Sequence, residues 1–256
     1  MQPVNASSNP VIDQMAKSSS LSHRVTGDLR RDIVAGILEP GEWLKTDDLA
    51  KRYGVSANPV REALWRLQGE GYVVANPNQG ARVRVVDDDF VRNIFEIREA
   101  LEPIIIRRFC KRATPSDIAR LREAAAVFSE IAARKTPNFV ALDTANRALH
   151  ATIMEGEINL QAIEVMDRYA GLINATRAKL PIAPAGLRVR MNQHEELVDA
   201  IASGNVEAAV AVATAHIRSA CEDMLTQMRQ VRTATARNAA AAGPAPAKRT
   251  VAAPAP

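Results

Sequence analysis

The segment GVSANPVREALWRLQGEGYV, residues 54–73, predicts a short helix with two different faces. One face is an apolar stripe at helical spacing, which suits docking on the helix's own domain. The stripe consists of Val60, Ala63, Leu64 and Leu67. The opposite face carries Asn58, Arg61 and Trp65. An amide and a guanidinium near the positive N-terminal end of a helix suit phosphates and base edges in a DNA major groove.

The start of this helix is open by two residues. Either Ser56 caps it, or Asn58 caps it and Pro59 takes the first helical position, where its missing N–H is harmless. Upstream, a longer helix is predicted by apolar residues that recur every four positions: Val25, Leu29, Ile33 and Ile37. A second short helix runs from about Thr46 to Gly54.

Downstream, residues 72–74 and 81–85 predict two strands joined by a turn over residues 76–80. Three helices and a β-hairpin wing make a winged helix-turn-helix, which we place at residues 21–86. Its predicted DNA contacts are Ser56, Asn58, Arg61 and Trp65 on the helix and Gly80, Arg82 and Arg84 on the wing. The alternative is a structural domain whose polar face is merely solvated.

The net charge of the whole chain is not an argument for DNA binding. The chain has 33 basic and 29 acidic residues and a net charge of +4. After Asp223, however, the tail contains five basic residues and no acidic one, which leaves 28 basic against 29 acidic residues before it. An argument for DNA must therefore rest on a local group of residues.

From residue 87 the pattern changes to long helical periodicity, which predicts an all-α bundle of six to seven helices over residues 87–232. The fold class is thus mainly α. Residues 1–20 and the Ala/Pro-rich residues 233–256 are predicted to be disordered. Cys110 and Cys221 form no Cys-x-x-Cys pair and indicate reduced thiols in a cytoplasmic protein. Neither a signal peptide nor a membrane span is expected.

Three of the four histidines fall in the bundle. Asn146 and His150 are four residues apart and share a helix face. His194 lies ten residues before Gly204 and His216 twelve after it, so in an antiparallel helix hairpin they can meet at one level. Three imidazoles and an oxygen ligand suit a divalent transition metal. The alternative is that each histidine is an ordinary hydrogen-bonded core or surface residue.

Residues 25–85 resemble the DNA-binding domain of the GntR family of bacterial transcription regulators. The resemblance is carried by AGILEPGEWL, DDLAKRYGVS, NPVREALWRLQGEGYV and the turn NPNQGARV. The family usually has an arginine directly after the serine of the recognition helix, where this chain has Ala57. That departure removes one habitual base contact, whereas Arg61 is retained.

The second domain is similar to the ligand-binding FCD domain of the FadR-type subgroup, through REALEPIIIRR, Leu149–His150 and QHEELVDAIASGNVEAAVAVATAHI. The resemblance implies a metal, with zinc expected first and nickel or manganese as alternatives, bound by Asn146, His150, His194 and His216. The family more often has Asp at the position of Asn146. The resemblance also directs Arg98 toward an effector carboxylate, although a surface pair with Glu102 is the alternative. Asn174 and Arg177 are expected at the same cavity.

These expectations define a dimeric, metabolite-responsive transcription regulator, more often a repressor, with double-stranded operator DNA and a small organic acid as partners. Two other classes stay open. A metal-dependent hydrolase is disfavoured because His194–Glu195 begins a His-Glu-x-x-His pattern that ends in Val198. A helical interaction module without a ligand is the third class.

Overall fold

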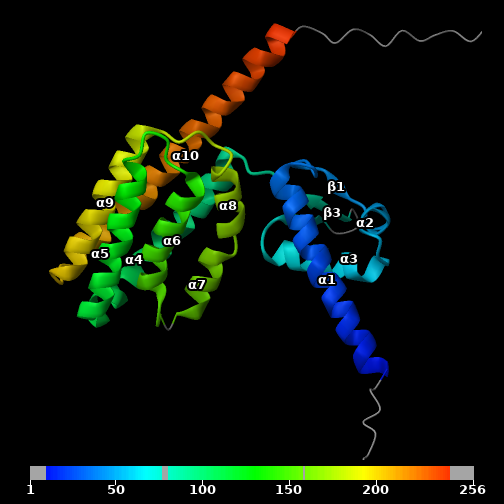
Figure 1. The fold of residues 1–256 in the computed structure, drawn as a ribbon, viewed down its shortest axis with the longest axis horizontal. Helices are drawn as coiled ribbons and strands as arrows, with labels where there is room; N and C mark the ends of the chain where they lie inside the picture. Colours follow the sequence, from blue (N-terminus) through cyan, green and yellow to red (C-terminus); the bar gives the residue numbers. More distant parts are fainter. Residues whose placement is uncertain (1–9, 77–79, 158, 243–256) are drawn as a thin grey trace, which may run out of the picture.

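The computed structural model describes residues 10–76, 80–157 and 159–242. It has two lobes, a small winged-helix lobe and a larger helical lobe (Figure 1). The predicted mainly helical fold, with an N-terminal winged helix-turn-helix and a C-terminal bundle, is confirmed. None of the helices in these residue ranges is long and apolar enough to cross a membrane.

The winged-helix lobe contains α1 (Pro10–Ala35), α2 (Thr46–Tyr53) and α3 (Ala57–Gly69). Its sheet has the order β1-β3-β2 and is antiparallel, with β1 at Trp43–Leu44, β2 at Val73–Asn76 and β3 at Gly80–Val83. The predicted stripe of α3 is buried together with Val25 and Leu29 of α1. Burial of this stripe leaves the opposite face of α3 outward.

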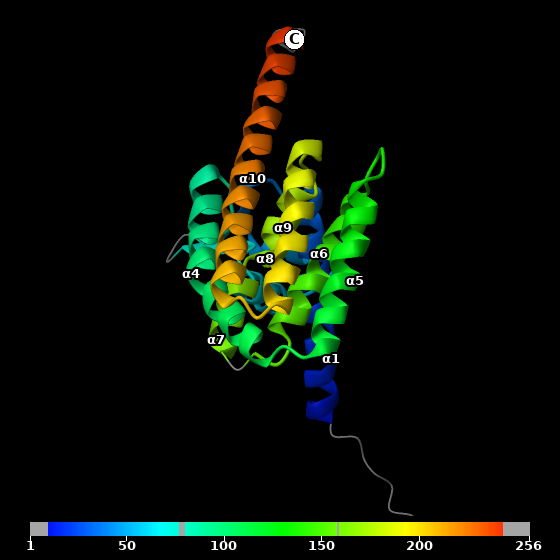
Figure 2. The same ribbon diagram turned by 90° about the vertical axis from the view of Figure 1, so that its left-hand side faces the viewer.

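The helical lobe contains seven helices within the described residues. They are α4 (Asp88–Arg112), α5 (Pro115–Ala132), α6 (Phe139–Met154), α7 (Leu160–Asp167), α8 (Ala170–Arg177), α9 (Pro184–Ala202) and α10 (Val206–Ala242). Figure 2 shows α4, α10, α9 and α5 side by side, with α6, α7 and α8 on the other side of this layer. The main apolar core lies between the two layers and includes Phe109, Leu121 and Leu149.

Local sequence explains where several of these helices begin. Asp87 caps α4 by accepting a hydrogen bond from the backbone of Phe90. Thr114 and Asp117 form a reciprocal capping box at α5, with Pro115 in the first turn. Asparagine side chains cap α6 and α7. These caps satisfy backbone N–H groups that have no partner inside the helix.

The predictions of disorder for residues 1–20 and 233–256 are wrong in part. The helix α1 begins at Pro10, so residues 10–20 are helical, and α10 continues to Ala242, so residues 233–242 are helical. Alanine has the highest helix propensity, which extends α10 through its Ala-rich end. Pro10 stands where a proline is tolerated, in the first turn of a helix. The remaining parts of both predictions, residues 1–9 and 243–256, lie outside the described residues.

The two lobes meet at α8. Leu172 of α8 is buried in the apolar core of the winged-helix lobe. Glycines allow this close approach: a Cβ on Gly71 would lie 2.3 Å from the ring of Tyr169, and one on Gly171 would lie 2.6 Å from the hydroxyl of Tyr72. Gly71 also has a φ of 81°, which other residues rarely adopt. The helix α8 is therefore in direct contact with the winged-helix lobe.

Candidate functional sites

The structure places the predicted recognition residues on the outer face of α3. Ser56 is the N-cap residue, which decides between the two starts left open by the sequence. Asn58 and Arg61 are exposed, and Trp65 is 81% exposed. Arg61 Nη2 donates a hydrogen bond to Asn58 Oδ1 over 2.5 Å. The amide thus holds the guanidinium on the open face of the helix, where it is available to a ligand.

A groove of about 780 Å³ lies between α3 and the sheet. It is lined by Asn58, Arg61 and Trp65 from the helix and by Gly80 from the wing strand. Trp43 and Lys45 also line it, and neither was predicted from the sequence. Their signal was weak because β1 has only two residues, too few to show a strand pattern.

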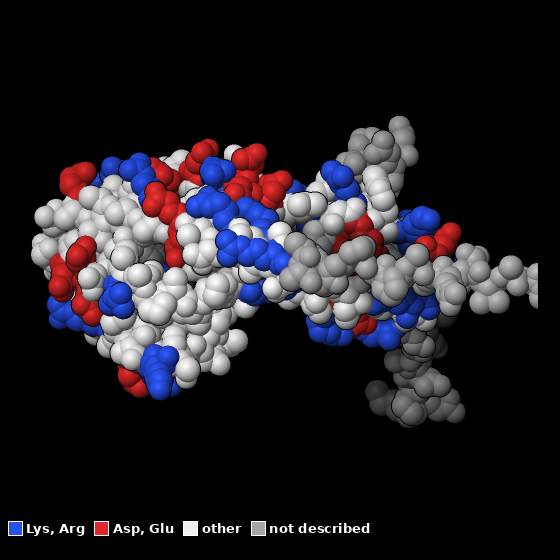
Figure 3. Space-filling view, turned by 90° about the horizontal axis from the view of Figure 1, so that it is seen from above, with Lys and Arg blue, Asp and Glu red and all other residues white. Residues whose placement is uncertain are grey.

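The two wing arginines differ in their surroundings. Arg82 is exposed, as a DNA-contacting residue requires. Arg84 is partly buried, donates from Nε to the carbonyl oxygen of Gly71 over 2.6 Å, and lies over the rings of Phe90 and Tyr169. Its guanidinium is therefore engaged at the junction between the lobes. On the face seen in Figure 3, basic and acidic side chains are interspersed, so the arrangement on α3 and the wing, and not bulk charge, supports DNA binding.

Three histidines meet inside the helical lobe. His150 of α6, His194 of α9 and His216 of α10 each offer a ring nitrogen, and these atoms all lie within 4.8 Å of one another. The ring centroids of His194 and His216 are 5.0 Å apart, and those of His150 and His216 are 5.8 Å apart. The convergence predicted from their distances to the turn at Gly204 is confirmed. A site with three neutral imidazoles is suited to a divalent transition metal.

Desolvation keeps these imidazoles neutral, with His194 and His216 buried and His150 half-buried. Desolvation, with smaller contributions from Arg98 and Arg177, lowers the pKa of His150 to about 4. Desolvation likewise lowers the pKa of His194 to about 3 and the pKa of His216 well below its usual value. A metal ligand must be deprotonated, so the lowered pKa values favour metal binding at neutral pH.

A further side chain orients the cluster. His216 Nδ1 lies 3.1 Å from Gln193 Oε1, and this oxygen can accept only if Nδ1 carries the proton. That tautomer leaves the lone pair of Nε2 free for a metal. Ser219 also donates to Gln193 Oε1, which fixes the amide. Gln193 was missed by sequence reasoning, although its position beside His194 offered a hint.

The residues present fit a metal. Both ring nitrogens of His194 and the Oδ1 atom of Asn146 are buried without a hydrogen-bond partner among the described residues. Buried polar atoms without partners are costly unless a ligand satisfies them. Asn146, His150, His194 and His216 would hold the ion, which would supply a Lewis-acidic site for an anionic ligand.

A cavity of about 510 Å³ adjoins the cluster, lined by His150 and His216 as well as the predicted effector residues Arg98, Asn174 and Arg177. The structure thus brings these residues together. Arg98 already donates to Glu102 Oε1 over 2.7 Å, so the pair with Glu102 is formed inside the cavity wall, with Glu102 buried. The predicted pair of Arg98 with Glu102 is therefore formed, but it lies in the cavity wall and not at the surface.

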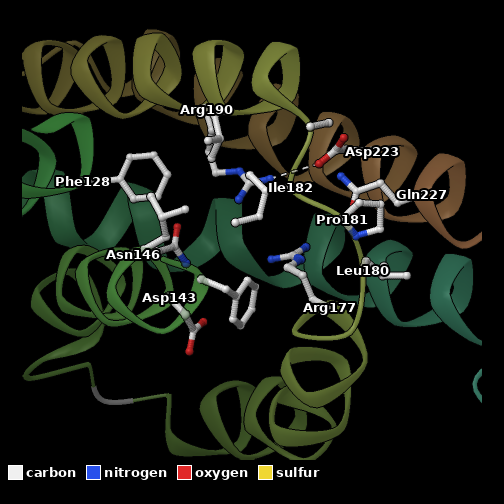
Figure 4. A pocket seen from close by; sticks show the side chains of 14 residues that line it. Phe128, Asp143, Asn146, Arg177, Leu180, Pro181, Ile182, Arg190, Asp223 and Gln227 are labelled. Atoms are coloured by element: carbon white, nitrogen blue, oxygen red, sulfur yellow. Dashed lines mark hydrogen bonds and ion pairs between the residues drawn. The ribbon is translucent and has the colours of Figure 1, made fainter. Parts of the chain in front are cut away.

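Arg190 of α9 also lines this cavity. It pairs with Asp223 of α10, Nη2 to Oδ2, over 3.2 Å. Gly186 permits that pair, since a Cβ there would lie 2.8 Å from Asp223 Oδ1. Sequence reasoning missed Arg190, although it lies one helical turn before His194. Figure 4 shows Arg190, Asn146 and Arg177 around an adjoining smaller pocket, each from a different helix.

The His-Glu-x-x-His arrangement of a metal-dependent hydrolase is not formed at His194. Glu195 is exposed, and the hydroxyl of Ser129 donates to its Oε1 over 3.3 Å. Val198, at the position of the second histidine of that pattern, is buried. The glutamate adjacent to His194 therefore points away from the histidine cluster.

Comparison with known proteins assigns both lobes. Residues 21–83 match the family described as bacterial regulatory proteins, gntR family, and residues 93–219 match the FCD domain. The chain is 39% identical over 84 residues to the Nta operon transcriptional regulator of Aminobacter aminovorans, covering 33% of this chain and 40% of that protein. It is 36% identical over 107 residues to the HTH-type transcriptional regulator McbR of Escherichia coli, covering 42% of this chain and 48% of that protein. These matches span less than half the length of either relative.

The similarity in structure covers more of the chain. The solved structure of McbR/YncC from Escherichia coli covers 81% of this chain and 98% of that one, with a TM-score of 0.60 and 25% identity. A winged helix-turn-helix with an exposed recognition helix, joined to a helical domain, defines a DNA-binding transcription regulator. The chain belongs to the GntR family of bacterial regulators, in the FadR-type group with a C-terminal FCD domain. The relatives are named as transcription regulators and not as enzymes, which agrees with the rejection of a hydrolase.

Proposed function

We propose that the protein is a homodimeric repressor that binds a palindromic operator in double-stranded DNA and responds to a small organic acid. Its target is chromosomal DNA, so its place of action is the bacterial cytoplasm. The observation that carries the effector part is the cavity between the three converging histidines and Arg177. Its wall combines a candidate cation site with a half-buried arginine whose Nη2 atom is buried without a partner, and an anion satisfies both.

The metal is proposed to be zinc, with nickel or manganese as alternatives. Three imidazoles suit zinc and nickel, and the amide oxygen is the type of ligand that manganese prefers. Asn146 and the three imidazoles are neutral, so the ion keeps its full charge of +2 in this site. That residual charge supports an acid as the effector, because a carboxylate oxygen can coordinate the ion and compensate for its charge.

Helix α8 connects the effector cavity with the winged-helix lobe and so supports coupling between effector and DNA binding. Asn174 and Arg177 of this helix line the cavity, while Leu172 is buried in the core of the winged-helix lobe. A ligand that favours one position of α8 therefore changes the orientation of α3 and the wing. Such a differential preference is what allosteric control requires.

Dimerisation is supported by an exposed apolar stripe on α4. Ile97 and Ile104 lie seven residues apart on one helix face and are each 39% exposed. Burial of this face against a second copy would remove apolar surface from water. A two-fold dimer presents two recognition helices to two similar half-sites, which explains the proposed palindrome.

The test begins with DNA fragments enriched by the purified full-length protein, which are sequenced for a shared palindrome. Metal content is then measured by mass spectrometry, and a panel of carboxylates is screened for release of the identified fragment in gel-shift assays. Enriched fragments without a shared motif would contradict the operator. A metal-loaded protein whose operator binding responds only to neutral or cationic metabolites would contradict the acid effector.

A further inference from the structure

Four arginines line the effector cavity, but their charges are not equally compensated. Arg98 is paired with Glu102, Arg147 with Asp143 and Arg190 with Asp223. Arg177 forms no ion pair with any carboxylate that the structure describes, and its Nη2 atom is buried without a hydrogen-bond partner. The nearest candidate partners are committed elsewhere, since Asp143 pairs with Arg147 and Asp223 with Arg190. Arg177 is therefore the guanidinium that a ligand must satisfy.

The position of Arg177 separates it from the groups that would bind a first carboxylate. Arg177 lies at the C-terminal end of α8 and lines two adjoining cavities. One is the larger cavity with His150 and His216, and the other is the smaller pocket drawn in Figure 4. In Figure 4 the guanidinium of Arg177 points into that pocket from the side opposite Asn146. A ligand bound at the histidine cluster can thus extend toward Arg177.

Charge balance favours a second acidic group at this end. An ion with a charge of +2, held by three neutral imidazoles and a neutral amide, and the charge of Arg177 together give three positive charges without carboxylate partners. One carboxylate would compensate for one of them and leave Arg177 or the ion unsatisfied in a buried site, which is costly. A second carboxylate can accept two hydrogen bonds from the guanidinium.

We propose that Arg177 receives a second carboxylate of the effector, so that the ligand is a small dicarboxylate and not a monocarboxylate. This inference rests on the proposed function, because it assumes an acid bound at the histidine cluster. It assigns Arg177 the role of selecting for the second acidic group. Arg98, with its own partner Glu102, would contribute less to that selection.

The experiment compares matched pairs of acids with the metal-loaded full-length protein by isothermal titration calorimetry. The pairs are malonate and propionate, succinate and butyrate, and glutarate and valerate, so that each pair differs by one carboxylate at constant carbon number. For at least one pair, the dicarboxylate is expected to bind at least about tenfold more tightly, which corresponds to about 1.4 kcal/mol. In Arg177→Met, this preference should fall to about threefold or less, with monocarboxylate affinity nearly unchanged.

Arg188→Met is the matched control. Arg188 is exposed on α9 and outside the cavity lining, so its replacement removes one positive charge without removing a wall residue. The control should keep the wild-type preference. Arg177→Lys should keep part of the preference, because a positive charge remains while the two-pronged geometry is lost. This second variant carries the test if Arg177→Met does not fold, as judged by circular dichroism and metal content.

The outcomes separate this inference from the proposed function. If no carboxylate binds the metal-loaded wild-type protein, the acid effector is wrong and the inference fails with it. If monocarboxylates and dicarboxylates bind equally well, or if the preference persists in the folded Arg177 variants, the inference alone is wrong. Loss of the preference in Arg188→Met as well would show a general charge effect, and it would also overturn the role of Arg177.

Discussion

The guanidinium carbon of Arg84 lies 5.4 Å from the ring centroid of Tyr169, so the end of the wing strand contacts the residue that precedes α8. The same guanidinium lies 5.1 Å from the ring centroid of Phe90, and the two rings meet edge to face at 5.4 Å. One cation thus joins the wing to two aromatic residues of the helical lobe. Such contacts stabilise by about 0.5–2 kcal/mol each, depending on desolvation.

Arg84→Met is therefore expected to lower the free energy of unfolding by about 1–2 kcal/mol and to weaken the effect of the effector on operator binding. The measurements are urea denaturation and operator affinity with and without effector. Arg82→Met is the control, because Arg82 is exposed and its loss should leave stability unchanged. The opposite result, unchanged stability with weaker operator binding, would show that Arg84 contacts DNA, as the sequence analysis predicts.

Arg61→Ala is expected to weaken operator binding by about 1–3 kcal/mol and to reduce discrimination between operator and random DNA, because the exposed guanidinium is placed to contact a base. Fluorescence anisotropy with both DNAs measures this. Arg82→Ala should instead weaken binding to both DNAs alike and reduce the salt dependence, as expected for a phosphate contact. Equal affinities of wild type and Arg61→Ala for the operator would remove Arg61 from the interface.

Replacement of His150, His194 or His216 by alanine should lower metal occupancy and the melting temperature of the metal-loaded protein, because each removes one ligand. Inductively coupled plasma mass spectrometry and thermal denaturation check this. The fourth histidine supplies the control: His23 lies on α1 in the winged-helix lobe, so His23→Ala should keep its metal. Full metal occupancy in all three cluster variants would show that these histidines are structural residues and not metal ligands.

Asn146→Asp tests the fourth ligand separately. A carboxylate attracts a cation more strongly than an amide does, so the variant is expected to bind the metal more tightly if Asn146 Oδ1 is a ligand. Competition with a chromophoric chelator measures the change. Asn174→Asp is a useful comparison, since Asn174 lines the same cavity but has not been assigned to the ion. Equal metal affinity in wild type and Asn146→Asp would exclude Asn146 from the coordination sphere.

Much of the fold could be predicted because its signals are local. The spacing of Val60, Ala63, Leu64 and Leu67 predicted α3, and alternation over residues 81–85 predicted the second wing strand. The strand β1 could not be predicted, because its two residues acquire their conformation from pairing with β3, Trp43 with Arg82 and Leu44 with Ala81. The ends of α1 and α10 were missed because composition alone does not show how far a docked helix continues.

The histidine cluster could be predicted because, in an antiparallel helix hairpin, two residues at similar chain distances from the turn lie at the same level. The residues that surround the cluster could not be predicted. Prediction of Arg190 required knowledge of which face of α9 meets α10, and Gln193 matters through its bond to His216. The engagement of Arg84 with Phe90 and Tyr169 depends on how the lobes dock, which no local pattern reveals.

The lowered pKa values of the cluster predict acid sensitivity of the metal-free protein. An unfolded histidine has a pKa near 6.5, whereas burial holds His150 at about 4 and His194 at about 3. As the pH falls below about 6.5, the unfolded chain binds protons that the folded cluster excludes, so stability is lost as the pH falls toward 4. The slope reaches at most about 1.4 kcal/mol per pH unit for each histidine.

The measurement is urea denaturation of chelator-treated protein between pH 7.5 and about pH 5. A variant with glutamine at positions 150, 194 and 216 should show a shallower pH dependence than wild type, because its side chains do not titrate, whereas His23→Gln should follow wild type. Bound metal should raise the free energy of unfolding by a nearly constant amount over this pH range, because the imidazoles of the folded cluster stay unprotonated. A wild-type free energy of unfolding that is constant from pH 7 to pH 5 would contradict a folded cluster of three neutral, desolvated imidazoles.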